Sequence, residues 1–264
     1  MSLKKDVAYA VWPRAATVVS SVRARRQSHR LVKEWGLFEL NRRLFAEFGD
    51  KVVAGPFKGL ILNDASRSEH IGPYLLGTYE MELHDTWARI LRQTFNQVID
   101  VDASFGYYAV GLASRFPNTP TVVFDTDWWA RRAARDMART NCLTNVTVKS
   151  VCSPAWLARN LRPRALIVSD CEGHEGQLFH GEIPNLDKAT LVVEVHEQFV
   201  PGVTDRLRAR FHGTHMLEVI DSRSRSPHPP RAKTLTPDEM KRALQEVRGQ
   251  QQWFVLRPLV VTGT

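Results

Sequence analysis

From Gln97 onward, short runs of β-branched and aliphatic residues alternate with segments of helical periodicity. The runs predict five strands, at residues 98–101, 121–124, 146–151, 165–169 and 191–195. Helices are expected at 107–116 and, with Asp127 as N-cap, from Trp128 to about Thr140. Because strands separated by helices usually pair in parallel with helices on both faces, this alternation predicts an α/β domain with a doubly wound, Rossmann-like sheet.

The end of the chain adds two strands to this pattern. Residues 216–220 and 253–261 are rich in apolar residues, and a helix at about 237–248 separates them. That helix has a strong start signal, because Thr236 and Glu239 have the spacing of a capping box. Together the runs predict a seven-stranded, mostly parallel sheet.

The residues before the sheet predict a helical extension. Residues 15–48 have the spacing of one or two amphipathic helices, residues 51–62 that of a short β-hairpin, and residues 80–95 that of a further helix. We therefore divide the chain into a basic N-terminal helical arm with short β elements, at 1–75, and the main α/β domain at 76–264.

Most of the positive charge lies in the first 35 residues. The net charge is +8, and residues 1–35 contain eight basic and two acidic residues. Such an arm is typical of a nucleic-acid or anionic-membrane contact. A solvated helix that packs on the domain explains the charge as well, and we favour this interpretation.

Other bulk features indicate a cytoplasmic protein. No stretch of about 18 apolar residues is present, so we expect no membrane span, and the N-terminus lacks the apolar core of a secretory signal. The three cysteines are odd in number and show no C-x-x-C spacing, which favours reduced thiols over a disulfide framework. The sequence leaves the oligomeric state open.

The loop after the first predicted strand is the best candidate for a ligand site. In a doubly wound sheet, ligands bind at the carboxyl ends of the strands. The loop there contains Ala103, Ser104 and Gly106, whose small size lets a ligand approach the backbone before a helix N-terminus. Asp125 ends the second strand, where an acid accepts hydrogen bonds from the ribose of either NAD or S-adenosylmethionine. Because only Gly106 of the G-x-G-x-x-G pattern is present, a cofactor without a pyrophosphate is favoured.

A set of motifs follows in a fixed order along residues 75–200. They are Gly77-Thr78-Tyr79-Glu80, Val98-Ile99-Asp100, Gly106-Tyr107-Tyr108, Phe124-Asp125, Asn141 to Val146, Ser169-Asp170-Cys171-Glu172-Gly173-His174-Glu175 and Val193-Glu194-Val195-His196. The paired patterns D-x-E-G-x-E and E-x-H are the most specific. In this order the motifs resemble the FkbM-type methyltransferases, a family with the class I methyltransferase fold whose members mostly methylate hydroxyl oxygens.

The resemblance implies a cofactor, a site and a reaction. The cofactor is S-adenosylmethionine, and the residues that would bind it are Glu80, Asp100, Asp102, Ala103, Ser104, Phe105, Gly106, Tyr107, Asp125, Thr126, Cys152, Ser153 and Asp170. Cys152 and Ser153 would approach the adenine, and Asp170 would close the pocket on the substrate side. The implied reaction is O-methylation of a small-molecule or sugar-like hydroxyl.

Asp102 departs from the family, which usually has glycine at this position. Glycine suits a turn with left-handed backbone angles, which aspartate adopts more readily than most other residues. The Asp102 carboxylate would repel the carboxylate of the cofactor or pair with its α-amino group. A catalytically weak methyltransferase-like protein is therefore one alternative. An RNA-contacting methyltransferase or binding protein that uses residues 1–35 is another.

Acidic residues and a histidine follow the fourth and fifth predicted strands. His196 is expected to be the general base, because imidazole titrates near neutrality, although a polar role at a strand end is an equally good interpretation. Asp170 and Glu172 are the other candidate catalytic residues, and Glu172 also suits a helix-end contact. Asp170, Glu194 and His196 could gather a divalent metal ion. Such oxygen-rich ligation would suit magnesium. Because the three residues lack a tight spacing signature, we assign no metal from the sequence, which leaves metal dependence open.

Overall fold

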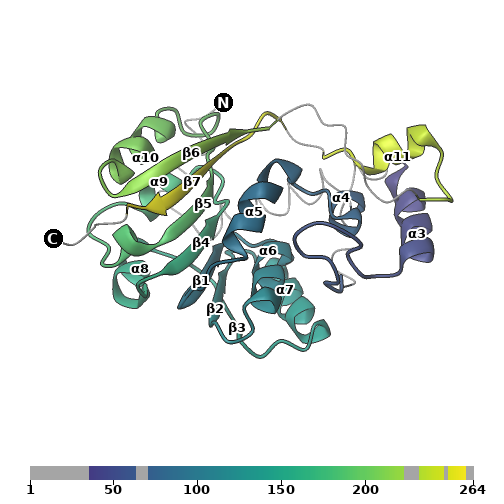
Figure 1. Ribbon diagram of the computed structural model, residues 1–264, viewed down its shortest axis with the longest axis horizontal. Coiled ribbons are helices and arrows are strands. Elements are labelled where there is room, and N and C mark those ends of the chain that lie inside the picture. Colours follow the sequence, from purple (N-terminus) through teal and green to yellow (C-terminus); the bar gives the residue numbers. More distant parts are fainter. Residues whose placement is uncertain (1–35, 64–70, 223–231, 247–248, 260–264) are drawn as a thin grey trace.

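The computed structural model describes residues 36–63, 71–222, 232–246 and 249–259. At its centre is a seven-stranded sheet with the order β3-β2-β1-β4-β5-β7-β6 (Figure 1). The strands are β1 (Gln97–Val101), β2 (Thr121–Phe124), β3 (Val146–Lys149), β4 (Ala165–Ser169), β5 (Thr190–Glu194), β6 (His215–Asp221) and β7 (Gln252–Pro258). Only β7 is antiparallel to its neighbours, β5 and β6. The predicted mostly parallel, seven-stranded α/β sheet is confirmed.

Helices cover both faces of this sheet. They are α3 (Leu37–Phe48), α4 (Gly72–Leu76), α5 (His84–Ile90), α6 (Tyr107–Arg115), α7 (Trp128–Thr140), α8 (Pro154–Asn160), α9 (Glu175–Leu178), α10 (Val203–Phe211) and α11 (Pro237–Ala243), with short 3-10 helices η2 (Met81–Leu83) and η3 (Leu186–Lys188). Alternate residues of β4 face opposite ways, so that Leu166 belongs to one buried cluster, with residues of α5 to α7, whereas Ile167 belongs to the other, with residues of α8 to α10. The sheet is therefore buried on both sides, as in a doubly wound fold.

Three parallel strands end at the same edge of the sheet. Val101 lies opposite Ser169, and Ser169 lies opposite Val193. The polypeptide that follows each strand therefore starts beside its neighbours, and it contains Asp102, Asp170 and Glu194. This edge is where the sequence predicts the functional residues.

The two predicted helix N-caps are confirmed. The Asp127 side chain accepts a hydrogen bond from the backbone N–H of Trp129 at 2.9 Å. Thr236 and Glu239 form both hydrogen bonds of a capping box. Helix α11 ends earlier than predicted, at Ala243.

Two predicted elements differ from the structure. The helix expected at 80–95 begins after Glu80, whose left-handed backbone angles (φ 45°) exclude it from the helix, and it consists of the 3-10 helix η2 followed directly by α5, which ends at Ile90. The hairpin expected at 51–62 is a tight turn with a single antiparallel bridge, between Lys51 and Ile61.

Two strand ends also differ from the prediction by one or two residues. Strand β3 ends at Lys149 instead of Val151, and β5 ends at Glu194 instead of Val195. Strand β7 ends at Pro258, and residues 260–261 of its predicted continuation lie outside the described residues.

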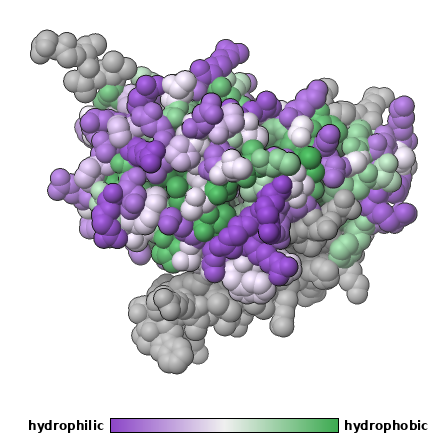
Figure 2. All heavy atoms as spheres, turned by 90° about the horizontal axis from the view of Figure 1, so that it is seen from below, coloured by the Kyte–Doolittle hydropathy of each residue, from purple (hydrophilic) through white to green (hydrophobic). Residues whose placement is uncertain are grey.

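Of the helical extension predicted at 15–48, the described part contains α3. The basic residues 1–35 lie outside the described residues, and the division into an arm at 1–75 and a domain at 76–264 stays a prediction. None of the helices in the described ranges combines the length and the apolar character that a membrane span needs. On the face shown in Figure 2, hydrophilic side chains surround a central apolar area.

Candidate functional site

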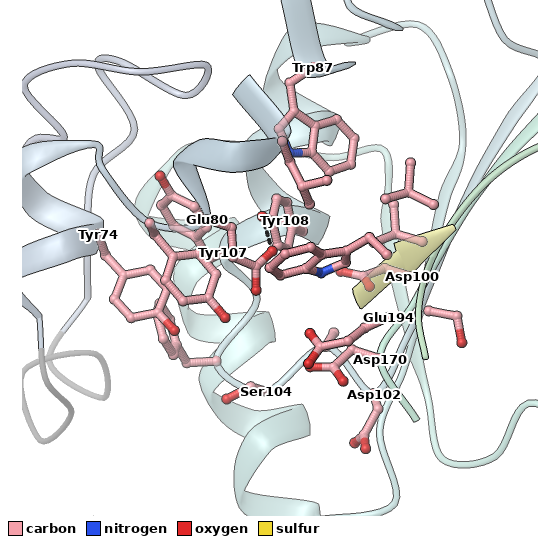
Figure 3. Close-up of a pocket in the computed structure, with 18 residues that line it drawn as sticks. Tyr74, Glu80, Trp87, Asp100, Asp102, Ser104, Tyr107, Tyr108, Asp170 and Glu194 are labelled. Carbon is pink, nitrogen blue, oxygen red and sulfur yellow. Dashed lines mark hydrogen bonds between the residues drawn. The ribbon is translucent and has the colours of Figure 1, made fainter. Parts of the chain in front are cut away.

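A cavity of about 60 Å³ lies at the carboxyl ends of β1, β4 and β5 (Figure 3). Its walls come from these strands, from the loop after β1, and from the segment between α4 and α5. The lining residues are Tyr74, Tyr79, Glu80, Leu83, Trp87, Asp100, Asp102, Ala103, Ser104, Phe105, Tyr107, Tyr108, Val168, Ser169, Asp170, Val192, Glu194 and Trp253. This is the strand-end crevice in which doubly wound folds bind ligands.

The loop after β1 has an unusual backbone. Asp102 (φ 67°), Ser104 (φ 51°) and Gly106 (φ 95°) all have positive φ angles. A Cβ atom on Gly106 would lie 3.2 Å from the Cα of Ala134, so α7 also leaves little room there. The left-handed geometry that the sequence predicts at Asp102 is confirmed.

Asp125 holds this loop in place. Its Oδ2 atom accepts a hydrogen bond from the backbone N–H of Ser104 at 2.9 Å, and its Oδ1 atom accepts one from the N–H of Asp127 at 2.7 Å. The carboxylate is buried. Asp125 therefore connects the end of β2 to the loop after β1, and it does not line the cavity itself.

The charged residues that line the cavity are all acidic. Glu80, Asp100, Asp102, Asp170 and Glu194 contribute carboxyl groups, and the lining residues include no lysine, arginine or histidine. Figure 3 shows the carboxyl groups of Asp102, Asp170 and Glu194 on one side of the cavity. Such a lining favours a cationic ligand group over an anionic one.

Burial changes the protonation of these acids. It raises the pKa of Asp102 well above its usual range, and the negative charges of Asp125 and Glu172 raise it further. It also raises the pKa of Asp170, an effect that Glu194 strengthens and His196 opposes. The cavity is thus able to hold neutral carboxyl groups as well as ionised ones.

Asp100 provides a test of this electrostatic picture. Burial raises its pKa to about 7, against a partly offsetting hydrogen bond from the backbone of Ala109. Because the folded-state pKa is higher than that of the unfolded chain, the contribution of Asp100 to stability is complete below about pH 4 and declines as the pH rises to about 7. We expect Asp100→Asn to unfold a few degrees higher than the wild type at pH 8 and to lose this advantage at pH 4.5. Thermal unfolding at both pH values measures this, and a difference that does not depend on pH would contradict it.

Aromatic rings form the opposite wall of the cavity. Tyr74 and Tyr79 stack with their ring centroids 4.1 Å apart, and Tyr107 packs edge-on against Tyr74 at 4.9 Å. The Tyr108 hydroxyl donates a 2.5 Å hydrogen bond to Glu80, which Figure 3 draws as a dashed line. Aromatic faces beside carboxylates are the surroundings that bind organic cations in proteins.

His196 lies just behind this cavity, among three acids. Its Nδ1 atom is 2.7 Å from Oε1 of Glu175, and its Nε2 atom is 3.4 Å from both Oδ1 of Asp170 and Oε1 of Glu194. Burial alone would lower the pKa of His196, but its contacts with these acids outweigh burial and raise the pKa to about 11. A protonated ring cannot accept a proton from a hydroxyl. The general-base role of His196 therefore stays a prediction that this arrangement disfavours.

The structure places the predicted site residues in two groups. Glu80, Asp100, Asp102, Ala103, Ser104, Phe105, Tyr107 and Asp170 line the cavity. Gly106, Asp125, Thr126, Cys152, Ser153, Glu172 and His196 are not among the lining residues.

The residues expected near an adenine have structural contacts of their own. Ser153 is the N-cap of α8, since its hydroxyl accepts a hydrogen bond from the N–H of Trp156 at 3.1 Å. Cys152 packs against an apolar core cluster, and burial raises the pKa of its thiol to about 12. Their role in adenine binding stays a prediction.

Sequence reasoning missed part of the aromatic wall. Tyr74 and Trp87 come from segments that precede the sheet, and their positions show no spacing that would connect them with the loop after β1. Trp87 has the periodicity of a core residue, and it is indeed almost completely buried. Tyr108 and Glu80 both belong to sequence motifs, but the hydrogen bond between them could be found only from the fold.

The strand order, the single antiparallel strand β7 and the crevice after β1 define a Rossmann-like fold of the class I methyltransferase type. No protein-family model matches the chain. A comparison with curated protein sequences finds no match either.

Solved structures with a similar arrangement include three proteins of low sequence identity. A precorrin-6y C5,15-methyltransferase from Geobacter metallireducens is 14% identical over 68% of this chain and 85% of its own, with a TM-score of 0.44. TrmN from Thermus thermophilus is 14% identical over 76% of this chain and 56% of its own, with a TM-score of 0.44. A putative O-methyltransferase from Klebsiella pneumoniae is 10% identical over 69% of this chain and 81% of its own, also with a TM-score of 0.44.

Proposed function

We propose that this protein is an S-adenosylmethionine-dependent methyltransferase, and that the cofactor binds in the cavity beside the loop after β1. The observation on which this proposal rests is the combination of five acids, several aromatic rings and no basic residue in the lining. S-adenosylmethionine carries a sulfonium and an α-ammonium group, and it has no phosphate. Its two cationic groups are therefore complementary to the carboxylates and aromatic faces.

The same lining argues against a nicotinamide cofactor. A pyrophosphate needs backbone N–H groups in a glycine-rich loop and tolerates no dense cluster of acids beside them. In this chain the N–H of Ser104 is already bonded to Asp125. An oxidoreductase is therefore the poorer assignment.

The cavity fits the cationic end of the cofactor in its chemistry. Oδ2 of Asp100 is buried and accepts no hydrogen bond from the described residues, so it is available to a ligand donor. The volume of about 60 Å³ is smaller than the roughly 300 Å³ or more of typical ligand pockets. Binding of the whole cofactor therefore requires movement of the lining side chains.

For the acceptor we propose a hydroxyl of a small molecule or a sugar-like compound. This proposal rests on the resemblance to FkbM-type methyltransferases. Asp170 lines the cavity between the loop after β1 and Glu194. We therefore propose that its carboxyl group orients the acceptor hydroxyl. Methyl transfer to oxygen depends mainly on alignment of the two reactants and on removal of one proton.

A second candidate function is cofactor binding with weak or no transfer, because an acid occupies the glycine-like position 102. Its raised pKa reduces the expected repulsion, since a neutral carboxyl does not repel the cofactor's carboxylate. We therefore expect Asp102→Gly to change affinity for S-adenosylmethionine by less than about tenfold, which corresponds to about 1.4 kcal/mol. A much larger gain in affinity would favour the second candidate.

The proposal is tested by calorimetric titration of the full chain with S-adenosylmethionine and with NAD⁺. We expect S-adenosylmethionine to bind at least about 100-fold more tightly, or about 2.7 kcal/mol, because the acidic lining repels the pyrophosphate. Mass spectrometry of the purified protein would detect cofactor that is carried along. Equal affinity for the two compounds, or tighter binding of NAD⁺, would contradict the proposal.

A further inference from the structure

His196, Asp170 and Glu194 form a compact cluster of possible metal ligands. One atom of each residue lies within 4.8 Å of the others. The residues come from the ends of two adjacent strands, since Asp170 follows β4 and Glu194 ends β5. The parallel pairing of these strands therefore brings together residues that are 24 positions apart in the sequence.

The distances within the cluster suit a bound ion. Nε2 of His196 lies 3.4 Å from an oxygen of each carboxylate. Bonds of about 2.1 Å to a tetrahedral ion place two ligand atoms about 3.4 Å apart. The two pairs that include Nε2 thus have this separation, and the two carboxylate oxygens lie within 4.8 Å of each other.

The carboxylate oxygens that face this point lack hydrogen-bond donors. Glu194 is 4% exposed, and neither its Oε1 nor Oδ1 of Asp170 takes part in a hydrogen bond with the described residues, although both atoms are buried. The cation beside them among the described residues is the His196 ring, whose Nε2 lies 3.4 Å from each oxygen and makes a hydrogen bond to neither. A metal ion in place of the Nε2 proton would compensate both oxygens directly. The buried oxygen of Glu194 without a hydrogen-bond donor therefore points to a ligand independently of the clustering.

Glu175 completes the arrangement from behind. Glu175 is fully buried. Its Oε1 atom accepts a hydrogen bond from the N–H of Gly173 at 3.0 Å, and the same oxygen lies 2.7 Å from Nδ1 of His196. Histidines that bind metals usually donate their second N–H to a carboxylate in this way, which orients the ring and makes the other nitrogen a better ligand.

We propose that Asp170, Glu194 and His196 bind a divalent transition-metal ion through Nε2 of the imidazole and one oxygen of each carboxylate, with Glu175 as the positioning residue of the histidine. Binding of the ion displaces the proton of Nε2 to solvent, so that the ring is neutral when it acts as a ligand. One nitrogen and two oxygen ligands favour transition metals such as Mn²⁺ or Zn²⁺ over Mg²⁺, which prefers an all-oxygen set. Because Asp170 and Glu194 also line the cavity, the ion would border the proposed cofactor site. The proposal goes beyond the proposed function and does not depend on it.

Titration of the full chain with Mn²⁺, followed by the electron paramagnetic resonance signal of the free ion, tests this site. We expect one equivalent to bind and Mg²⁺ to compete only weakly. Glu194→Gln and Asp170→Asn remove ligands, and each should weaken binding by about 10-fold or more; Glu175→Gln should weaken it by about 10- to 100-fold through the orientation of the ring. Glu182→Gln is the matched control, because Glu182 is exposed and outside the cluster, and it should bind as the wild type does.

Two further measurements, pulsed electron paramagnetic resonance and thermal unfolding, complete the test. Pulsed electron paramagnetic resonance of bound Mn²⁺ should show coupling to a nitrogen, which a site without His196 would lack. Thermal unfolding of each variant identifies any that fail to fold, and Asp170→Asn is the variant of choice because the Asp170 side chain is 47% exposed. No stoichiometric binding by the wild type, or equal binding by Asp170→Asn, would overturn the proposal. S-adenosylmethionine is titrated separately without Mn²⁺, so failure of the metal site and failure of the cofactor site are distinguishable.

Discussion

Gly77→Ala is expected to destabilise the protein by about 3–4 kcal/mol and to lower its unfolding temperature by about 10 °C. A Cβ atom at Gly77 would lie 2.0 Å from the carbonyl oxygen of Ala54. Its φ angle of +70° is also unfavourable for alanine. The two backbones cannot move apart easily, because the N–H of Val53 donates a 2.9 Å hydrogen bond to the carbonyl of Leu75.

Thermal or denaturant unfolding measures this effect, and Gly202→Ala provides the matched control. Gly202 has a similar left-handed conformation (φ 79°), but no heavy atom lies within 4 Å of an added Cβ. The control should lose only about 1 kcal/mol of stability, which is the cost of placing alanine in a left-handed conformation. Equal losses in the two variants would show that the contact with Ala54 does not determine the need for glycine at position 77.

Asp125→Ala is expected to weaken binding of S-adenosylmethionine by about 100-fold and to destabilise the protein by about 2–4 kcal/mol. The substitution removes the acceptor of the N–H groups of Ser104 and Asp127. The loop after β1 would then lose the contact that holds its left-handed backbone against β2. The substitution would also remove the acid for which the sequence predicts a contact with the ribose.

The control for this prediction is Asp127→Ala, the same substitution two positions along the chain. Asp127 caps α7 and is only partly buried, so its removal should cost about 1 kcal/mol of stability and leave affinity for the cofactor within about threefold. Calorimetry and thermal unfolding give both quantities. Equal affinity of Asp125→Ala and Asp127→Ala for the cofactor would contradict a role of Asp125 in the site.

Much of the architecture is determined by local sequence. The strands and helices from Gln97 to Phe124 were predictable because buried runs, helical periodicity and turn residues are signals within a few positions of one another. The helix caps at Asp127 and Thr236 could be predicted for the same reason, because each depends on residues within three positions of the cap. The helix expected at 80–95 is helical over 81–90, and its start was misplaced because the left-handed angles of Glu80 have no clear signature in a non-glycine residue.

The loop after β1 shows how far such reasoning extends. Its location at a strand end could be predicted from residue types, whereas the left-handed geometry of Asp102 was implied by the glycine that FkbM-type methyltransferases usually have there. The hydrogen bond from Ser104 to Asp125, however, joins residues 21 positions apart, and it depends on the pairing of β1 with β2. The sequence indicated the position of the site but not the contacts that shape it.

By itself, then, the sequence determined the order of strands and helices, the strand-end loop and the acids that follow β4 and β5. Only the tertiary structure decided which groups meet. It placed Tyr74 and Trp87 against the loop after β1, and it oriented His196 toward Glu175 on one side and toward Asp170 and Glu194 on the other. The physical reason is that contacts between neighbouring strands and between the sheet and its helices depend on register and packing, and neither leaves a periodic pattern along the chain.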